Sequence, residues 1–124
     1  MQPLKIAFEL EEAEAPSRRL DAQIATFAGW KRKVYRLEGH DRIGVLWLLP
    51  GETESRLPEF TKSVDAAFEF VSIILPGQSF GVAWLPKHEK TEYHAVFENG
   101  DKAVGCTAAI AICAAALKAR AAIS

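Results

Sequence analysis

The chain has 124 residues, of which 49% are hydrophobic and 25% charged, as expected for one globular domain spanning residues 1–124. Its formal net charge of −1 excludes a strong overall attraction to nucleic acid or to an anionic membrane. No apolar run is long enough to span a bilayer, and the first residues lack the pattern of a secretory signal peptide. We therefore expect a cytoplasmic protein whose two cysteines are reduced thiols.

The first thirty residues predict two short helices. The first runs from Pro3 to Ala15, and its acidic residues cluster toward the helix C-terminus, where the macrodipole disfavours them. We therefore expect either that this helix frays or that its carboxylates pair with bases elsewhere. Pro16 separates the helices, and Ser17 is placed to cap the second, which ends at Gly29. The residues expected to face the core are Leu4, Ala7 and Phe8 in the first helix and Leu20, Ile24, Phe27 and Ala28 in the second.

The middle of the chain predicts two strands and a third helix. Lys33–Leu37 and Arg42–Leu49 are the strands, and Gly39-His40-Asp41 forms the turn between them. The third helix lies between Pro58 and Pro76, with Thr61 or Ser63 as its cap. Its expected core-facing residues are Val64, Ala67, Phe68, Val71, Ile74 and Leu75.

The last third predicts two more strands and a buried helix. Ser79–Leu85 and Glu92–Glu98 are the strands, and alternation in the second indicates one face exposed to water. The segment 100–105 is expected to be a flexible connection. In Thr107–Ala122 nine of sixteen residues are Ala, which favours a helix with neighbours packed closely around it. The element order is therefore α-α-β-β-α-β-β-α, an α+β domain in which an antiparallel sheet of about four strands is covered by helices.

Three segments together resemble the phage ABA sandwich domain family, whose members are small proteins of phages and prophages. They are Pro16-Ser17-Arg18-Arg19-Leu20-Asp21-Ala22-Gln23-Ile24 with Gly29-Trp30, then Leu57-Pro58-Glu59-Phe60-Thr61-Lys62-Ser63-Val64-Asp65-Ala66-Ala67, and the alanine-rich run Ala111–Arg120. Arg19 departs from the pattern, since an acidic residue is common there. The resemblance implies an α/β/α sandwich in a phage accessory protein, which would be located in the cytoplasm of a bacterial host cell, and it implies no activity. The regions 33–49 and 79–98 are individual to this chain, so they are expected to recognise the partner.

The most suggestive local feature is the basic and aromatic stretch from Trp30 to Arg36. Four bases and two aromatic residues lie within seven positions. Such a stretch suits a protein interface, contact with the phosphates and bases of nucleic acid, or a plain solvated face. The candidate partner-binding residues are Trp30, Lys31, Arg32, Lys33 and Arg36. Trp30 follows Gly29 and is expected to fold back against the end of the second helix, but Trp30 and Phe60 both lie in connections, so exposure at an interface stays open for them. Trp47 and Trp84 are expected in the core.

Catalytic chemistry has weak support in the sequence. His88, Glu92 and His94 would bind a metal if the hairpin that carries them paired tightly, and the alternative is an ordinary solvated hairpin. Cys113 is expected to be an inert core thiol. Cys106 precedes a helix, but nothing nearby in the sequence supplies a base. No catalytic residue and no cofactor is predicted.

Three functions follow as hypotheses. The first is a non-catalytic binding protein of phage or prophage type that occupies a surface of a host or phage protein, for example by inhibiting a defence complex as anti-CRISPR proteins do. The second is a small nucleic-acid-binding accessory protein that uses residues 30–36. The third is a metal-dependent enzyme or metal-binding protein. A monomer and a homodimer both stay open, with the alanine-rich helix or strands 79–85 and 92–98 as possible dimer seams.

Overall fold

The computed structural model describes residues 2–36, 39, 43–51, 53–98 and 100–123. The helices in these ranges are α1 (Pro3–Glu12), α2 (Arg18–Phe27), α3 (Val64–Ile74) and α4 (Ala108–Ile123). The strands are β1 (Lys31–Arg36), β2 (Ile43–Leu48), β3 (Glu54–Ser55), β4 (Phe80–Pro86), β5 (Thr91–Phe97) and β6 (Ala103–Gly105). None of these helices is long and apolar enough to cross a membrane.

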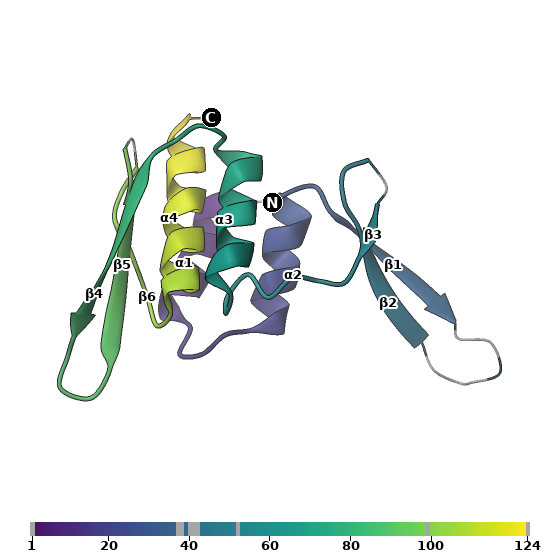
Figure 1. Cartoon of the computed structure of the whole chain (residues 1–124), viewed down its shortest axis with the longest axis horizontal. Coiled ribbons are helices and arrows are strands. Elements are labelled where there is room, and N and C mark those ends of the chain that lie inside the picture. Colours follow the sequence, from purple (N-terminus) through teal and green to yellow (C-terminus); the bar gives the residue numbers. More distant parts are fainter. Residues whose placement is uncertain (1, 37–38, 40–42, 52, 99, 124) are drawn as a thin grey trace.

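The α+β class and the predicted element order are confirmed, but the strands are arranged differently. They form two three-stranded antiparallel sheets, β1-β2-β3 and β4-β5-β6, and not one sheet of about four strands. Figure 1 shows the helices between them, with β4-β5-β6 against α4 and β1-β2-β3 standing off on the opposite side. The short strands β3 and β6 were not predicted, and β6 lies in the segment 100–105 that was expected to be a flexible connection.

Helix α4 is the centre of the fold. Ten of its sixteen residues are buried, and it packs against α1, α3 and the β4-β5-β6 sheet. Small side chains allow this close approach, as Gly105 illustrates. A Cβ on Gly105 would lie 2.7 Å from the backbone nitrogen of Ala111. Because this helix is buried within the chain, it is not the dimer seam that the sequence left open.

A buried polar network joins the segment before α3 to α2 and α4. The Asp21 carboxylate accepts hydrogen bonds from the backbone N–H and the hydroxyl of Thr61, both at 2.8 Å, and pairs with Arg18. The Thr107 hydroxyl donates to the Thr61 carbonyl and accepts from the Ile110 N–H, which caps α4. Asp21 and Thr61 are both at most 1% exposed. The network therefore fixes the three helices relative to one another.

The predicted caps of α2 and α3 are confirmed. Ser17 accepts from the Leu20 N–H, and Ser63, the second of the two candidates, accepts from the Ala66 N–H. Gly29 has a φ of 95°, the left-handed conformation expected after a helix. Two acidic residues of α1 also pair with bases, Glu9 with Arg19 and Glu11 with Lys118.

The predicted inward faces of α1 and α3 are partly wrong. Leu4 and Phe8 are exposed, and Ile6, Ala7 and Leu10 are the buried residues of α1. In α3, Val64 and Phe68 are exposed, whereas Ala66 and Phe70 are buried. Helical periodicity indicates an apolar stripe, but both helices have apolar residues on more than one side. Contact with α4 decides which side is covered.

Candidate functional site

The β1–β2 hairpin, residues 31–36 and 43–48, forms an arm that projects from the helices (Figure 1). All six residues of β1 are exposed. The predicted strands are confirmed within two residues, and the strands pair from Lys31 opposite Leu48 to Arg36 opposite Ile43. The predicted turn residues His40 and Asp41 lie outside the described residues. The arm thus presents nearly all of the basic stretch to solvent.

Strand alternation divides the arm into two faces. The first, here called the arginine face, consists of Arg32, Val34, Arg36, Ile43 and Val45, and it ends at the base of the arm in the buried Trp47, which lies opposite Arg32. Its apolar members are exposed to 55% for Val34, 65% for Ile43 and 39% for Val45. Three exposed β-branched side chains flanked by two guanidinium groups form a surface of mixed apolar and cationic character. Val34 and Val45 are directly opposite each other in the register.

The second face, here called the lysine face, consists of Lys31, Lys33, Tyr35, Leu46 and Leu48. Lys33 donates to Glu54 of β3 at 2.6 Å, and this hydrogen bond raises the pKa of the ammonium group. The Tyr35 ring lies over Gly44, in space that any Cβ on residue 44 would occupy. One of the bases is therefore already paired within the arm, and the aromatic ring covers backbone.

The base of the arm is fixed by the helical part of the chain. Trp47 is only 7% exposed, and a pocket of about 370 Å³ lies beside it. The Arg18 guanidinium donates to the carbonyls of Leu57 and Pro58 while it pairs with Asp21, so this arginine holds the chain that follows β3. The residues that line the pocket are Arg18, Tyr35, Val45, Leu46, Trp47, Arg56 and Leu57.

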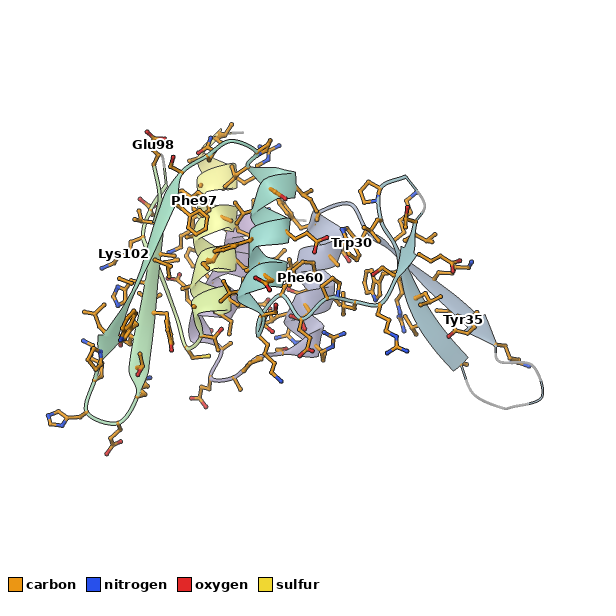
Figure 2. The ribbon with its side chains drawn as sticks, viewed as in Figure 1. Trp30, Tyr35, Phe60, Phe97, Glu98 and Lys102 are labelled. Carbon is orange, nitrogen blue, oxygen red and sulfur yellow. The ribbon has the colours of Figure 1, made fainter. Side chains whose placement is uncertain are left out.

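Trp30 folds back against the end of α2, as one reading of the sequence expected, so its choice as an exposed partner-binding residue is wrong. It is 3% exposed, its backbone N–H donates to Ala25, and its ring meets Phe60 edge to face at 6.0 Å. Phe60, whose exposure the sequence left open, is fully buried. Trp84, predicted in the core, is 70% exposed, while Trp47 is buried as predicted. Figure 2 shows Tyr35 on the arm, well away from Trp30 and Phe60.

The candidate metal ligands are only partly brought together. The Nε2 of His94 lies 3.2 Å from the Glu92 carboxylate, and this hydrogen bond lowers the carboxylate pKa. His88 is exposed in the turn before β5. Within the described ranges, no group of three or more His, Cys, Asp or Glu side chains is arranged to hold a metal ion.

The two cysteines are free thiols in environments that disfavour a nucleophile. Cys113 is fully buried, its thiol donates to the Phe60 carbonyl, and burial raises its pKa. Burial also raises the pKa of Cys106, which lines a pocket of about 480 Å³ together with Glu11, Glu12, Glu14 and Glu92. Carboxylates beside a thiol do not stabilise a thiolate. Lys90 also lines this pocket and acts to lower the pKa of the thiol, but burial is the larger influence and keeps the pKa of Cys106 raised.

No family model, curated protein or solved structure matches this chain. The resemblance to the phage ABA sandwich domain family therefore rests on the three sequence segments alone. The structure gives those segments a physical role, because Asp21, Phe60, Thr61 and Ser63 belong to the buried network or cap a helix. The arm lies outside them.

Proposed function

We propose that this chain is a non-catalytic binding protein of phage or prophage type, and that the arginine face of the arm contacts a partner protein. The observation that carries the proposal is the exposure of Val34, Ile43 and Val45 on a hairpin that projects from the helices. Exposed apolar side chains grouped on one face are costly in water, and such groups mark interaction sites.

The composition of this face favours protein over nucleic acid. Protein interfaces are enriched in arginine around an apolar centre. Arg32 and Arg36 flank Val34 on one side of β1, whereas Lys31 and Lys33 point to the other side. The four bases therefore do not form one continuous cationic track of the kind that follows a phosphate backbone.

The experiment uses one substitution at two matched valines. Val34→Asp places a carboxylate in the centre of the arginine face, and Val96→Asp places one on the exposed face of β5. The full chain and both variants are used to capture proteins from a lysate of a bacterial host. We expect a stoichiometric protein that the natural chain and the Val96 variant retain and the Val34 variant loses. Equal capture by all three would contradict the proposal.

Inhibition of a host defence complex is one concrete form that this function would take in a protein of phage type, and such an inhibitor would act in the bacterial cytoplasm. Its support is the resemblance alone. The captured partner tests it directly, because a subunit of a defence complex would have to be among the proteins lost with Val34→Asp.

Nucleic acid is the second candidate, and the lysine face favours it. Lys31, Lys33 and the partly exposed Tyr35 lie on one side of β1, an arrangement of the kind used for single-stranded nucleic acid. Phosphate contacts weaken steeply with salt, so titration of a labelled oligonucleotide at two salt concentrations tests this candidate. If the double variant Lys31→Glu and Lys33→Glu lost oligonucleotide binding and Val34→Asp kept it, the function of the arm would be nucleic-acid binding through the lysine face.

A further inference from the structure

The two sheets end in four edge strands, and three of these edges are protected. An open edge exposes unpaired backbone groups to other chains, and proteins protect edges with charge, shortness or cover. β1 carries four basic residues, and β3 has two residues. β6 has three residues and is covered, because its Val104 N–H donates to the Glu11 carboxylate of α1 at 3.0 Å.

Strand β4 is the fourth edge and has none of these protections. It is seven residues long, its sequence is FGVAWLP, and no charged residue interrupts it. Residues 81–86 are all exposed, with Val82 at 44%, Trp84 at 70% and Leu85 at 40%. Its single proline, Pro86, stands at the end of the strand. Within the described residues, β4 is the longest uncharged edge that is open to pairing.

The backbone groups of β4 that face solvent can be assigned from the ladder. Antiparallel residues alternate between pairing with the neighbouring strand and pointing away from it. Ser79 accepts from Glu98 and Lys87 donates to Lys90, so the odd-numbered residues of β4 point toward β5. Phe80, Val82 and Trp84 therefore direct their N–H and C=O groups outward. The same alternation places Val104 outward on β6, where the bond to Glu11 is found.

We propose that the occupant of this edge is a second copy of the same chain, paired antiparallel through β4 with Ala83 on the twofold axis. In this register Val82 of one copy lies opposite Trp84 of the other, and each pair exchanges two backbone hydrogen bonds. The side chains of Phe80, Val82 and Trp84 share the face that continues into the core, where Phe80 stacks on Phe97 at 4.8 Å. Pairing therefore covers the exposed indole and joins the two cores along one six-stranded sheet.

The opposite face of the sheet supports the same register. Leu85 of one copy falls opposite Gly81 of the other, and a Cβ on Gly81 would meet no atom within 4 Å. An exposed leucine thus faces open space above a glycine. Lys87 of one copy falls opposite Ser79 of the other. Within that other copy Ser79 is hydrogen-bonded to Glu98, so the Glu98 carboxylate lies two strand spacings, about 10 Å, from the lysine. A shift of the register by one residue at the axis would place Leu85 opposite Ser79 instead.

The first test compares two valines of equal exposure. Val82 and Val96 are each 44% exposed in the same sheet, but only Val82 lies on the edge strand. Sedimentation equilibrium across micromolar to millimolar concentrations should give a natural species of twice the chain mass of 13.6 kDa. Val82→Lys should raise the dimer dissociation constant at least about tenfold, and Val96→Lys should leave it unchanged. A natural chain that stays monomeric throughout, or equal effects of both variants, would overturn the proposal.

The second test examines the register and does not depend on the stability of a charged variant. Two Ala83→Cys residues facing each other across the axis form a non-hydrogen-bonded pair with Cα atoms about 4.5 Å apart, which a disulfide can bridge. Two Leu85→Cys residues would be about 13 Å apart. In a Cys106→Ser background, mild oxidation should cross-link the Ala83 variant and leave the Leu85 variant monomeric on a non-reducing gel. Faster cross-linking of the Leu85 variant would overturn the register.

The dimer does not rest on the function proposed for the arm. Figure 1 places β4 and the arm on opposite sides of the helices, so pairing through β4 leaves both arms free. The dimer would present two arms at once, which strengthens binding to a partner that offers two sites. Val82→Lys tests the dimer by mass and Val34→Asp tests the arm by capture, so failure of one is distinguishable from failure of the other.

Discussion

The helical body and the arm are held together by different physical means. In the body, ten of the sixteen residues of α4 are buried, and Asp21, Thr61 and Thr107 make hydrogen bonds between elements far apart in the sequence. In the arm, the six residues of β1 are exposed, and its ion pair with the neighbouring β3, between Lys33 and Glu54, is also exposed to solvent. The body therefore contains the contacts that stabilise the chain. The arm contributes little to stability, which is consistent with its proposed role in binding a partner.

The same contrast applies to aromatic residues. Trp30 and Phe60 come from connections, yet they are buried because the chain turns back onto α3 and the end of α2. Trp84 and Tyr35 come from strands, yet they are partly or largely exposed, because the helices do not extend over the far end of β4 or over the arm. Residue type alone does not distinguish these cases. The extent of the neighbouring helices does.

The largest predicted loss of unfolding free energy comes from a substitution at the centre of the body's polar network. Asp21→Ala leaves the Thr61 N–H, the Thr61 hydroxyl and the Arg18 guanidinium without their shared acceptor. The Arg18 side chain that remains is 56% exposed, so no buried charge is left behind. A buried donor that loses its acceptor costs about 1–3 kcal/mol of unfolding free energy. Urea denaturation followed by circular dichroism measures it.

Asp65→Ala is the matched control for this prediction. Asp65 is exposed in the first turn of α3, so its loss should cost only about 0.5 kcal/mol through the helix dipole. Equal losses in the two variants would show that the network does not hold the body together.

An intermediate effect depends on pH and comes from Cys113. Burial raises the pKa of this thiol in the folded chain, while in the unfolded chain it titrates near its ordinary value of 9.0. The stabilisation is therefore complete below pH 9 and is lost as pH rises above it, because only the unfolded state then releases the proton. The expected slope from this thiol is about 1 kcal/mol per pH unit.

Cys113→Ala isolates this contribution. The variant keeps every other group that titrates in the same range, so the difference between its slope and that of the natural chain is due to the thiol alone. Urea denaturation at several values between pH 8 and pH 11 gives both slopes. Parallel curves would mean that water reaches the thiol in the folded body, contrary to its full burial.

The sequence predicts local structure well and tertiary placement poorly. Ser17, Ser63 and Gly29 were assigned correctly, because a cap or a left-handed turn depends on a few neighbouring residues. The sequence did not predict that the strands form two separate sheets. The alternation of apolar and polar residues along a strand shows which residues share a face, but not which helix covers that face. The strand β6 was missed for the same reason, since its three residues are ordered by α4 and by Glu11.

The candidate site was predicted in part. The bases Lys31, Arg32, Lys33 and Arg36 are exposed on the arm as expected, because charged residues in a strand seldom find buried partners. Ile43 and Val45 were missed as surface residues, since an apolar strand is normally a core strand. The distance between the arm and the helices, which leaves them exposed, has no signature in the local pattern.

The smallest predicted effect is in the arm. Lys33→Ala removes the bond to Glu54, and an exposed ion pair of this kind is screened by solvent and salt. Because this bond raises the lysine pKa, any stabilisation it gives is present below the ordinary lysine pKa and fades as pH rises through the raised value. The urea midpoint of the whole chain should not change. Hydrogen exchange should become faster at the amides of β1 and β2 and stay constant in α4, whereas a shift of the global midpoint would mean that the arm contributes to the stability of the body.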